Sequence, residues 1–256
     1  MAWTESGPSD GPALVMIHGA PGSQRDFRWL APPLHDRGIR VIRLDMPGFG
    51  ASAGEPIPLR SVASHILRRL DQLELDRAVL LGHSLGGAAS MLTASQAPER
   101  IRGLVLMASV GLRPHRGFRR LKGLRAVNRG LKLPLVRRPL IRMVETLFRA
   151  SGFSSHVSRE EMRRTLTLVE QLDFAKLNAA VRRLEVPTAV IYSDDDPLIE
   201  PTIPEQLGHV VPHGPRLRFE TGGHNPQKPW ACEIAEAIGP WTHELLRVRA
   251  LPAAPS

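Results

Sequence analysis

The stretch Ala78-Val-Leu-Leu-Gly-His-Ser-Leu-Gly-Gly87 joins a short apolar run to a serine that glycines flank on both sides. Its centre, Gly82–Gly86, fits the pattern G-x-S-x-G, in which the glycines allow a sharp turn between a strand and a helix. The apolar run predicts a buried strand, and the small residues from Leu85 to Gln96 predict a helix directly after it. Ser84 is therefore a candidate nucleophile, while the plainer interpretation is a tight turn whose serine caps a helix.

Short apolar runs and helical patterns alternate along the chain before and after this stretch. Alternation at this spacing predicts βαβ units, and hence an α/β fold with a mostly parallel central sheet and helices on both faces. The predicted strands span residues 13–18, 39–45, 78–82, 104–108, 186–192 and 217–219, and the predicted helices span residues 24–37, 59–73, 85–96 and 231–247.

The alternation is interrupted between residues 112 and 184, where only amphipathic helical patterns occur. Ser158 begins one of these patterns, and Glu161 completes a capping box with it. We expect residues 1–111 and 185–256 to form the core, and residues 112–184 to form a helical cap inserted between two core strands. The other patterns place Phe118, Leu121, Leu124, Val127 and Leu131 on one helical face, and Leu140, Ile141, Val144, Leu147 and Phe148 on another.

A serine hydroxyl stays protonated at neutral pH unless a base accepts its proton, so Ser84 needs a histidine and an acid that orients it. His224 lies in the glycine-rich segment after the last predicted strand, from which it can reach a strand-end serine across the top of the sheet. Asp194–Asp196 follow the preceding strand and supply candidate acids. A single histidine is more often structural, and the others in comparable segments, namely His115, His156, His209 and His213, do not follow a predicted strand in this way.

Five short segments of the sequence, taken in order, resemble the α/β-hydrolase family, and the resemblance extends from about Pro12 to Leu246. It is closest to the small cytosolic esterases, thioesterases and carbon–carbon hydrolases that carry a helical cap. Because His18 comes so early, we expect the family's first antiparallel strand to be missing from this sequence and the second to be at best a stub near Trp3–Ser6. Either the sheet has seven strands or fewer, or the true start of the protein lies upstream. The matching segments are His18-Gly-Ala-Pro-Gly22, Asp45-Met-Pro-Gly-Phe-Gly-Ala-Ser52, Gly82-His-Ser-Leu-Gly-Gly87, Asp196-Pro197 and Gly223-His224.

The resemblance implies the roles of the site residues. The backbone N–H groups of Ala20 and Leu85 would form an oxyanion hole, although an ordinary strand-to-helix turn would also favour Gly and Pro near Ala20. In the family the acid is the Asp of a G-x-x-D turn. Ser193 stands in the place of the glycine here, which selects Asp196 as the acid that orients His224, with Asp195 as the alternative. Related dehalogenases and epoxide hydrolases have an Asp nucleophile, so Ser84 argues against both activities.

The resulting hypothesis is a serine hydrolase that cleaves a small carboxylic ester or thioester through an acyl-enzyme, with the cap lining the acyl pocket. The alternatives are carbon–carbon bond hydrolysis by the same triad and a catalytically silent member that binds a ligand. The resemblance implies no cofactor. The sequence has no cluster of metal ligands at sensible spacing, so we expect no metal either.

The net charge of +9 is concentrated in the expected cap. Residues 113–149 contain twelve Lys or Arg and a single acid, Glu145, and the rest of the chain is nearly neutral. The plainer interpretation is a solvated helical surface. The alternative is an anionic partner: a lipid surface, the phosphates of a coenzyme A thioester, or an acidic carrier protein. Aromatic residues make up only 5% and no nucleic-acid motif occurs, which argues against nucleic-acid binding.

Composition also bears on the cellular compartment. No apolar run reaches the roughly 18–20 residues that a membrane-spanning helix requires, and the first residues lack the features of a secretory signal. Cys232 is the only cysteine, so the chain has no internal disulfide. We therefore expect a cytoplasmic protein.

Overall fold

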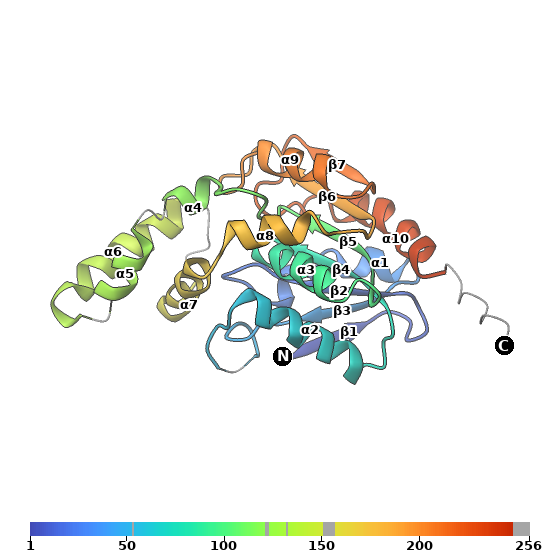
Figure 1. Ribbon diagram of the computed structural model, residues 1–256, viewed down its shortest axis with the longest axis horizontal. Coiled ribbons are helices and arrows are strands. Elements are labelled where there is room, and N and C mark those ends of the chain that lie inside the picture. Colours follow the sequence, from blue (N-terminus) through green and yellow to red (C-terminus); the bar gives the residue numbers. More distant parts are fainter. Residues whose placement is uncertain (53, 121–122, 132, 151–156, 248–256) are drawn as a thin grey trace.

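The computed structural model describes residues 1–52, 54–120, 123–131, 133–150 and 157–247. Its centre is a seven-stranded sheet in the order β1-β3-β2-β4-β5-β6-β7 (Figure 1). β1 is antiparallel to β3 and every other neighbouring pair is parallel, which confirms the predicted α/β fold. The strands are β1 Trp3–Ser6, β2 Ala13–Ile17, β3 Arg40–Leu44, β4 Ala78–His83, β5 Ile101–Met107, β6 Thr188–Ser193 and β7 Arg216–Phe219.

Helices cover both faces of the sheet. Successive strand residues point to opposite sides, so Val15 of β2 joins one buried cluster while Leu14 and Met16 join the other. The first cluster is completed by α2 and α3, and the second by α1 and α10. The helices are η1 Gln24–Phe27, α1 Ala31–His35, α2 Leu59–Gln72, α3 Leu85–Gln96, α4 Arg116–Arg120, α5 Leu124–Gly130, α6 Pro134–Ala150, α7 Arg159–Glu170, α8 Phe174–Val181, α9 Thr202–Val210 and α10 Ala231–Arg247.

The expected stub at Trp3–Ser6 is the edge strand β1, which pairs with β3 from Trp3 opposite Leu44 to Ser6 opposite Val41. The single helix expected over residues 24–37 is wrong. The structure has the short 3-10 helix η1 there, followed by the separate α1. Pro32 and Pro33 lack the backbone N–H that a continuous helix needs, so they stand in the first turn of a new helix instead.

Between β5 and β6 the described residues form the helices α4 to α8 and the loops that join them, and no strand. The capping box of α7 is confirmed, since the Ser158 hydroxyl accepts from the Glu161 N–H and the Glu161 carboxylate accepts from the Ser158 N–H. The helix expected through Phe118 and Leu131 is split into α4 and α5, and Gly123 before α5 has a φ of +80° that ends a regular helix. Leu121 lies outside the described residues. The division of the chain into core and cap domains remains a prediction.

The helices α4, α5 and α6 extend away from the sheet, while α8 lies along α3 (Figure 1). α6 is attached to α7 by a small apolar cluster of Val144, Phe148, Met162 and Leu166. This arrangement places α7 between the outermost helices and the strand ends that carry Ser84 and His224. None of the described helices is long and apolar enough to cross a lipid bilayer.

Candidate active site

Ser84 stands at the turn between β4 and α3, in a backbone conformation that few residues adopt. Its φ of 54° and ψ of −120° place it outside the helix that begins at Leu85. Its N–H donates to the Met107 carbonyl at 3.0 Å, and its carbonyl accepts from the Gly87 N–H at 3.0 Å. A residue other than glycine is strained when its backbone has a positive φ, and such strain is concentrated at functional sites. The surrounding hydrogen bonds therefore hold the serine at the end of the strand.

Glycines make this turn possible because other backbone lies where their side chains would be. A Cβ on Gly82 would lie 2.5 Å from the Gly86 carbonyl oxygen, and one on Gly86 would overlap the Ile17 carbonyl. A Cβ on Gly19 would lie 2.8 Å from the Ser84 Cβ. The glycines of the sequence motif thus bring the turn and the loop after β2 against each other.

The loop after β2 is anchored by His18, which is fully buried. Its Nε2 accepts from the Met46 N–H at 2.9 Å, so the proton is on Nδ1, which donates to the Gly19 carbonyl. Burial lowers the pKa of His18, against the opposing effects of the Gly19 carbonyl and of Asp26 and Asp45, and keeps the ring neutral. Because a trans peptide is planar, fixing the Gly19 carbonyl also fixes the direction of the Ala20 N–H.

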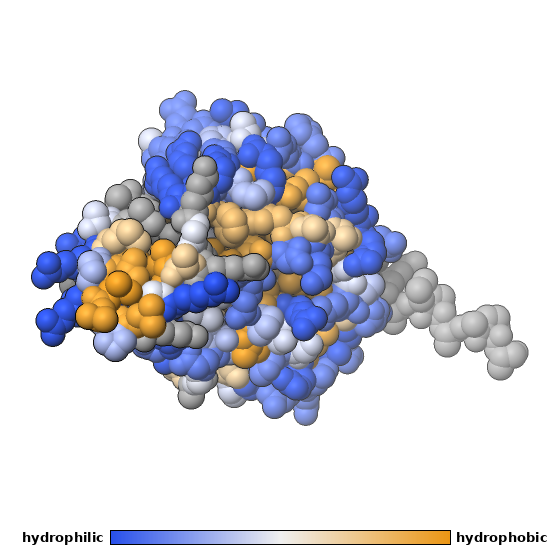
Figure 2. Space-filling model, turned by 60° about the vertical axis from the view of Figure 1, so that its left-hand side comes forward, coloured by the Kyte–Doolittle hydropathy of each residue, from blue (hydrophilic) through white to orange (hydrophobic). Residues whose placement is uncertain are grey.

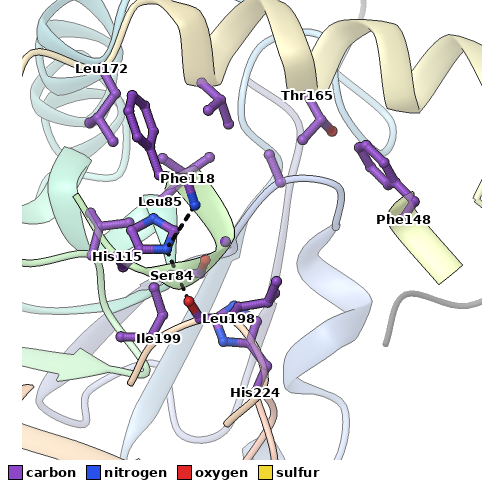
Figure 3. A pocket seen from close by; sticks show the side chains of 14 residues that line it. Ser84, Leu85, His115, Phe118, Phe148, Thr165, Leu172, Leu198, Ile199 and His224 are labelled. Carbon is purple, nitrogen blue, oxygen red and sulfur yellow. Dashed lines mark hydrogen bonds between the residues drawn. The ribbon is translucent and has the colours of Figure 1, made fainter. Parts of the chain in front are cut away.

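Leu85 lines one pocket together with Ser84 (Figure 3), and Ala20 lines the same pocket. The backbone N–H groups of Ala20 and Leu85 donate to no other residue in the described part of the chain. Leu85 is the first residue of α3, where N–H groups lack helical partners and the helix dipole favours negative charge. Both groups are thus available to a substrate oxygen, as the predicted oxyanion hole requires.

Asp196 and His224 meet at the ends of the neighbouring strands β6 and β7. The His224 Nδ1 donates to Asp196 Oδ2 at 2.8 Å, and the other carboxylate oxygen accepts from the N–H groups of Leu198 and Ile199 at 2.8 and 3.0 Å. Burial alone would raise the pKa of Asp196, but His224 and the two backbone N–H groups lower it overall. The carboxylate therefore stays charged and fixes the tautomer in which His224 Nε2 is free to accept a proton.

Asp195, the alternative acid, has different partners. Its carboxylate accepts from the N–H of Gly223 at 2.7 Å and from that of Gly222 at 3.3 Å. It therefore ties the loop that carries His224 to the end of β6, without touching the imidazole ring. The geometry favours Asp196 as the partner of His224.

His83 contacts the same loop, a role that the sequence motif did not indicate. The sequence places this residue only as the variable position of the elbow, and its contact with His224 depends on how the last loop folds back. Its Nε2 donates to the His224 carbonyl at 2.7 Å, and the two rings lie 4.9 Å apart. Burial, and then the neighbouring His224, lower the pKa of His83 to about 3, so the ring is a neutral donor that holds His224 in place.

His115 also lines the pocket, although sequence reasoning set it aside because it follows no strand in the expected way (Figure 3). Its Nδ1 lies 3.1 Å from the Leu198 carbonyl oxygen and 3.3 Å from the Phe118 backbone nitrogen, two contacts that require opposite tautomers. We assign the proton to Nδ1 because the contact with the carbonyl is the shorter one, and this leaves Nε2 as an acceptor. Burial lowers the pKa of His115 to about 4, so the ring is neutral at neutral pH. Only the three-dimensional contact with Leu198 reveals this position.

The rest of the pocket is apolar, and none of the described residues that line it is Lys, Arg, Asp or Glu. Its polar groups are the side chains of Ser84, His224, His115 and Thr165. The described residues contain no group of three or more His, Cys, Asp or Glu side chains placed to hold a metal ion. The remaining lining residues are Ala20, Leu85, Val110, Gly117, Phe118, Phe148, Val169, Leu172, Leu198 and Ile199.

Comparison with known proteins agrees with the fold. A 2-hydroxymuconate semialdehyde hydrolase of Pseudomonas sp. is 31% identical, over 90% of this chain and 87% of that protein. An acetyltransferase component of the acetoin cleaving system of Pseudomonas putida is 40% identical, but the match spans only 44% of this chain and 30% of that protein. The solved structure of a haloalkane dehalogenase from Bradyrhizobium elkani has a TM-score of 0.74 at 21% identity, covers 96% of this chain and 95% of its own, and shares the fold.

The sequence also matches a family as a whole. Residues 14–237, most of the chain, match the alpha/beta hydrolase family. The matched range includes β3 to β7, all of β2 except Ala13, and Ser84, Asp196 and His224. The chain therefore belongs to the alpha/beta hydrolase family.

Proposed function

We propose that this hydrolase cleaves carboxylic esters or thioesters through an acyl-enzyme on Ser84. The observation that carries the proposal is the pair of His224 and Asp196, joined at 2.8 Å, with the imidazole lining the same pocket as Ser84. A nucleophile, a base and a carboxylate that orients the base are the parts that acyl transfer by serine requires. The apolar lining suits the acyl part of such a substrate.

In the first half-reaction the Ser84 Oγ attacks the substrate carbonyl carbon while its proton passes to His224 Nε2. The carbonyl oxygen becomes an oxyanion, which accepts hydrogen bonds from the N–H groups of Ala20 and Leu85. The bond to the leaving oxygen or sulfur then breaks, and His224 donates its proton to that atom. The product alcohol or thiol leaves, and the acyl group remains on Ser84.

In the second half-reaction water replaces the leaving group. His224 accepts a proton from the water, whose oxygen attacks the acyl carbon. The bond to Ser84 Oγ then breaks, and His224 returns the proton to the serine. Asp196 stays ionised throughout and stabilises the imidazolium that forms in each half-reaction.

Carbon–carbon bond hydrolysis is the second candidate, because a relative that matches 90% of the chain at 31% identity is named a 2-hydroxymuconate semialdehyde hydrolase. A muconate derivative carries a carboxylate, which is costly to bury without a cation. No Lys or Arg is among the described residues that line the pocket. This lack of a cation favours an uncharged acyl group and hence the ester or thioester.

The proposal is tested with a panel of p-nitrophenyl esters of increasing chain length, acyl thioesters and a vinylogous diketone carboxylate. We expect turnover of esters or thioesters with a burst of p-nitrophenol equal to the enzyme concentration. Ser84→Ala and His224→Gln should each lower kcat by at least about 10³-fold. His209→Gln, a change at an exposed histidine of α9, should leave kcat unchanged. Turnover of the diketone alone would favour the second candidate, and no turnover of any substrate would favour a silent ligand-binding member.

A further inference from the structure

Large apolar side chains are exposed between Leu133 and Met143, just before α6 and along its first ten residues. Leu135 is 96% exposed, Leu133 is 57% exposed, and Val136 and Met143 are 41% and 47% exposed. We call these four residues the cap-tip patch. Figure 2, in which this end of the molecule comes forward, shows apolar residues gathered there beside strongly hydrophilic ones. Apolar side chains clustered on a surface mark sites of interaction more often than scattered ones do.

The patch is not a part of the interior that has been left uncovered. α6 buries Val144 and Phe148 against Met162 and Leu166 of α7, which completes the small cluster between these helices. The patch residues lie on the other side of α6 or in the turn before it. α6 therefore has one apolar surface that α7 covers and a second that no other described element covers.

Arginines share α6 with the patch, and two of them, Arg137 and Arg138, also line the groove between α6 and α7. Arg137, Arg138 and Arg142 of α6 are exposed, and none of them forms an ion pair with another described residue. The one acid of the segment, Glu145, is paired with Arg159 at 2.7 Å. α6 therefore carries four arginines against this single acid, which gives the helix that bears the patch an excess of positive charge.

We propose that the cap-tip patch binds the surface of an anionic lipid bilayer. Aliphatic side chains next to arginines on one helix are what an interfacial helix needs, because the aliphatic groups enter the acyl region while the guanidinium groups bind phosphates. A lipid surface is fluid, so it accommodates a side chain as protruding as Leu135 without a matching pocket. This inference does not depend on the catalytic proposal.

The charge distribution argues against a second copy of the chain as the occupant. A symmetric dimer through α6 would bring the arginines of one copy against those of the other, because such an interface uses the same patch twice. Like charges facing each other across an interface oppose association. An anionic surface removes this repulsion, and the attraction grows with each basic residue near it.

The test is flotation of the full chain with vesicles of phosphatidylcholine alone and of phosphatidylcholine mixed with phosphatidylglycerol. We expect the protein to float with the anionic vesicles only, and to bind them less as salt is added. The paired changes Leu135→Ser with Val136→Ser, and Arg137→Glu with Arg138→Glu, should each weaken binding by at least about tenfold.

The matched control is Arg182→Glu with Arg183→Glu, the same charge change at two exposed arginines after α8. It should bind within about twofold of the unmodified chain, and circular dichroism should show all variants folded. Equal binding to neutral and anionic vesicles, unchanged binding by the patch variants, or no binding at all would each overturn the proposal. The proposal would also be overturned if the unmodified chain bound no vesicles but formed a dimer, and if Leu135→Ser converted that dimer to monomers.

Discussion

Asp196 is the side chain on which the orientation of His224 depends, because its buried carboxylate accepts from the imidazole at 2.8 Å. Asp196→Asn keeps the shape but presents a neutral amide to Nδ1, which disfavours the reactive tautomer. We expect kcat to fall by about 10³–10⁴-fold with little change in KM. Asp195→Asn is the matched comparison, and steady-state kinetics of both variants should show a much smaller loss for it. A loss at Asp195 equal to or larger than that at Asp196 would reverse the assignment.

His83 makes the stability of the fold depend on acidity. Burial, and then His224, lower its pKa from 6.5 to about 3 in the folded protein, while the unfolded chain keeps the ordinary value. Between about pH 3 and pH 6.5, the unfolded state therefore binds a proton that the folded state does not bind. Stability is therefore lost as the pH falls below 6.5, at up to about 1.4 kcal/mol per pH unit.

His83→Gln keeps a donor for the His224 carbonyl and removes the titration. Urea unfolding at about pH 7 and about pH 5 should show a smaller loss of unfolding free energy in this variant than in the unmodified chain. His18 and His115 are present in both proteins and contribute equally. The same loss in both proteins would mean that His83 is not buried as a neutral ring.

His115 gives the apolar pocket a hydrogen-bond acceptor, since its Nδ1 proton is engaged by the Leu198 carbonyl. A hydroxyl on the acyl chain would pair with Nε2, and a site built for such a group discriminates strongly against its loss. His115→Leu should lower kcat/KM for hydroxyacyl esters by about tenfold or more, and leave unsubstituted esters within about threefold. An equal loss for both kinds of ester would indicate a general packing role.

At the scale of elements, the turn between β4 and α3 tolerates no added volume. Gly82→Ala would place a Cβ 2.5 Å from backbone atoms of Gly86 and Gly87, which cannot withdraw without breaking the turn. We expect a loss of about 3 kcal/mol or more in the free energy of unfolding, measured by urea denaturation. Gly208→Ala in α9 is the control, because its Cβ would meet only side-chain atoms of Arg216, at 3.2 Å, and no backbone atom. An equally mild effect of both changes would contradict the close approach.

Sequence patterns predicted the elements of the sheet well, because buried parallel strands are continuous apolar runs that stand out from helical patterns. β5 begins at Ile101, ahead of the expected start at Leu104, because Arg102 and Gly103 interrupt the apolar run. α8 and α9 were not predicted. α9 contains Pro204 and begins after Pro201, so its local sequence reads as a turn, and tertiary packing of Ile203 and Leu207 makes it a helix.

Across the whole molecule, the site residues that could be predicted from the sequence are those that directly follow a strand. Ser84, Asp196 and His224 follow strands whose carboxyl ends share one edge of the sheet, so their proximity follows from the topology. His83 and His115 act through contacts with the His224 and Leu198 carbonyls, which depend on how loops fold back and leave no pattern in the sequence. The positive charge of residues 113–149 was visible in the sequence, but the exposure of Leu135 within this segment required the structure.

The central claim is that Ser84 is an activated nucleophile, and the most direct test is mass spectrometry after treatment with a fluorophosphonate. Such a reagent reacts with a serine that a neighbouring base activates, and leaves ordinary serines unmodified. We predict a single adduct on Ser84, no adduct on Ser84→Ala, and a slower reaction in His224→Gln. An unmodified Ser84 on folded protein, or an adduct that persists in Ser84→Ala, would contradict the account.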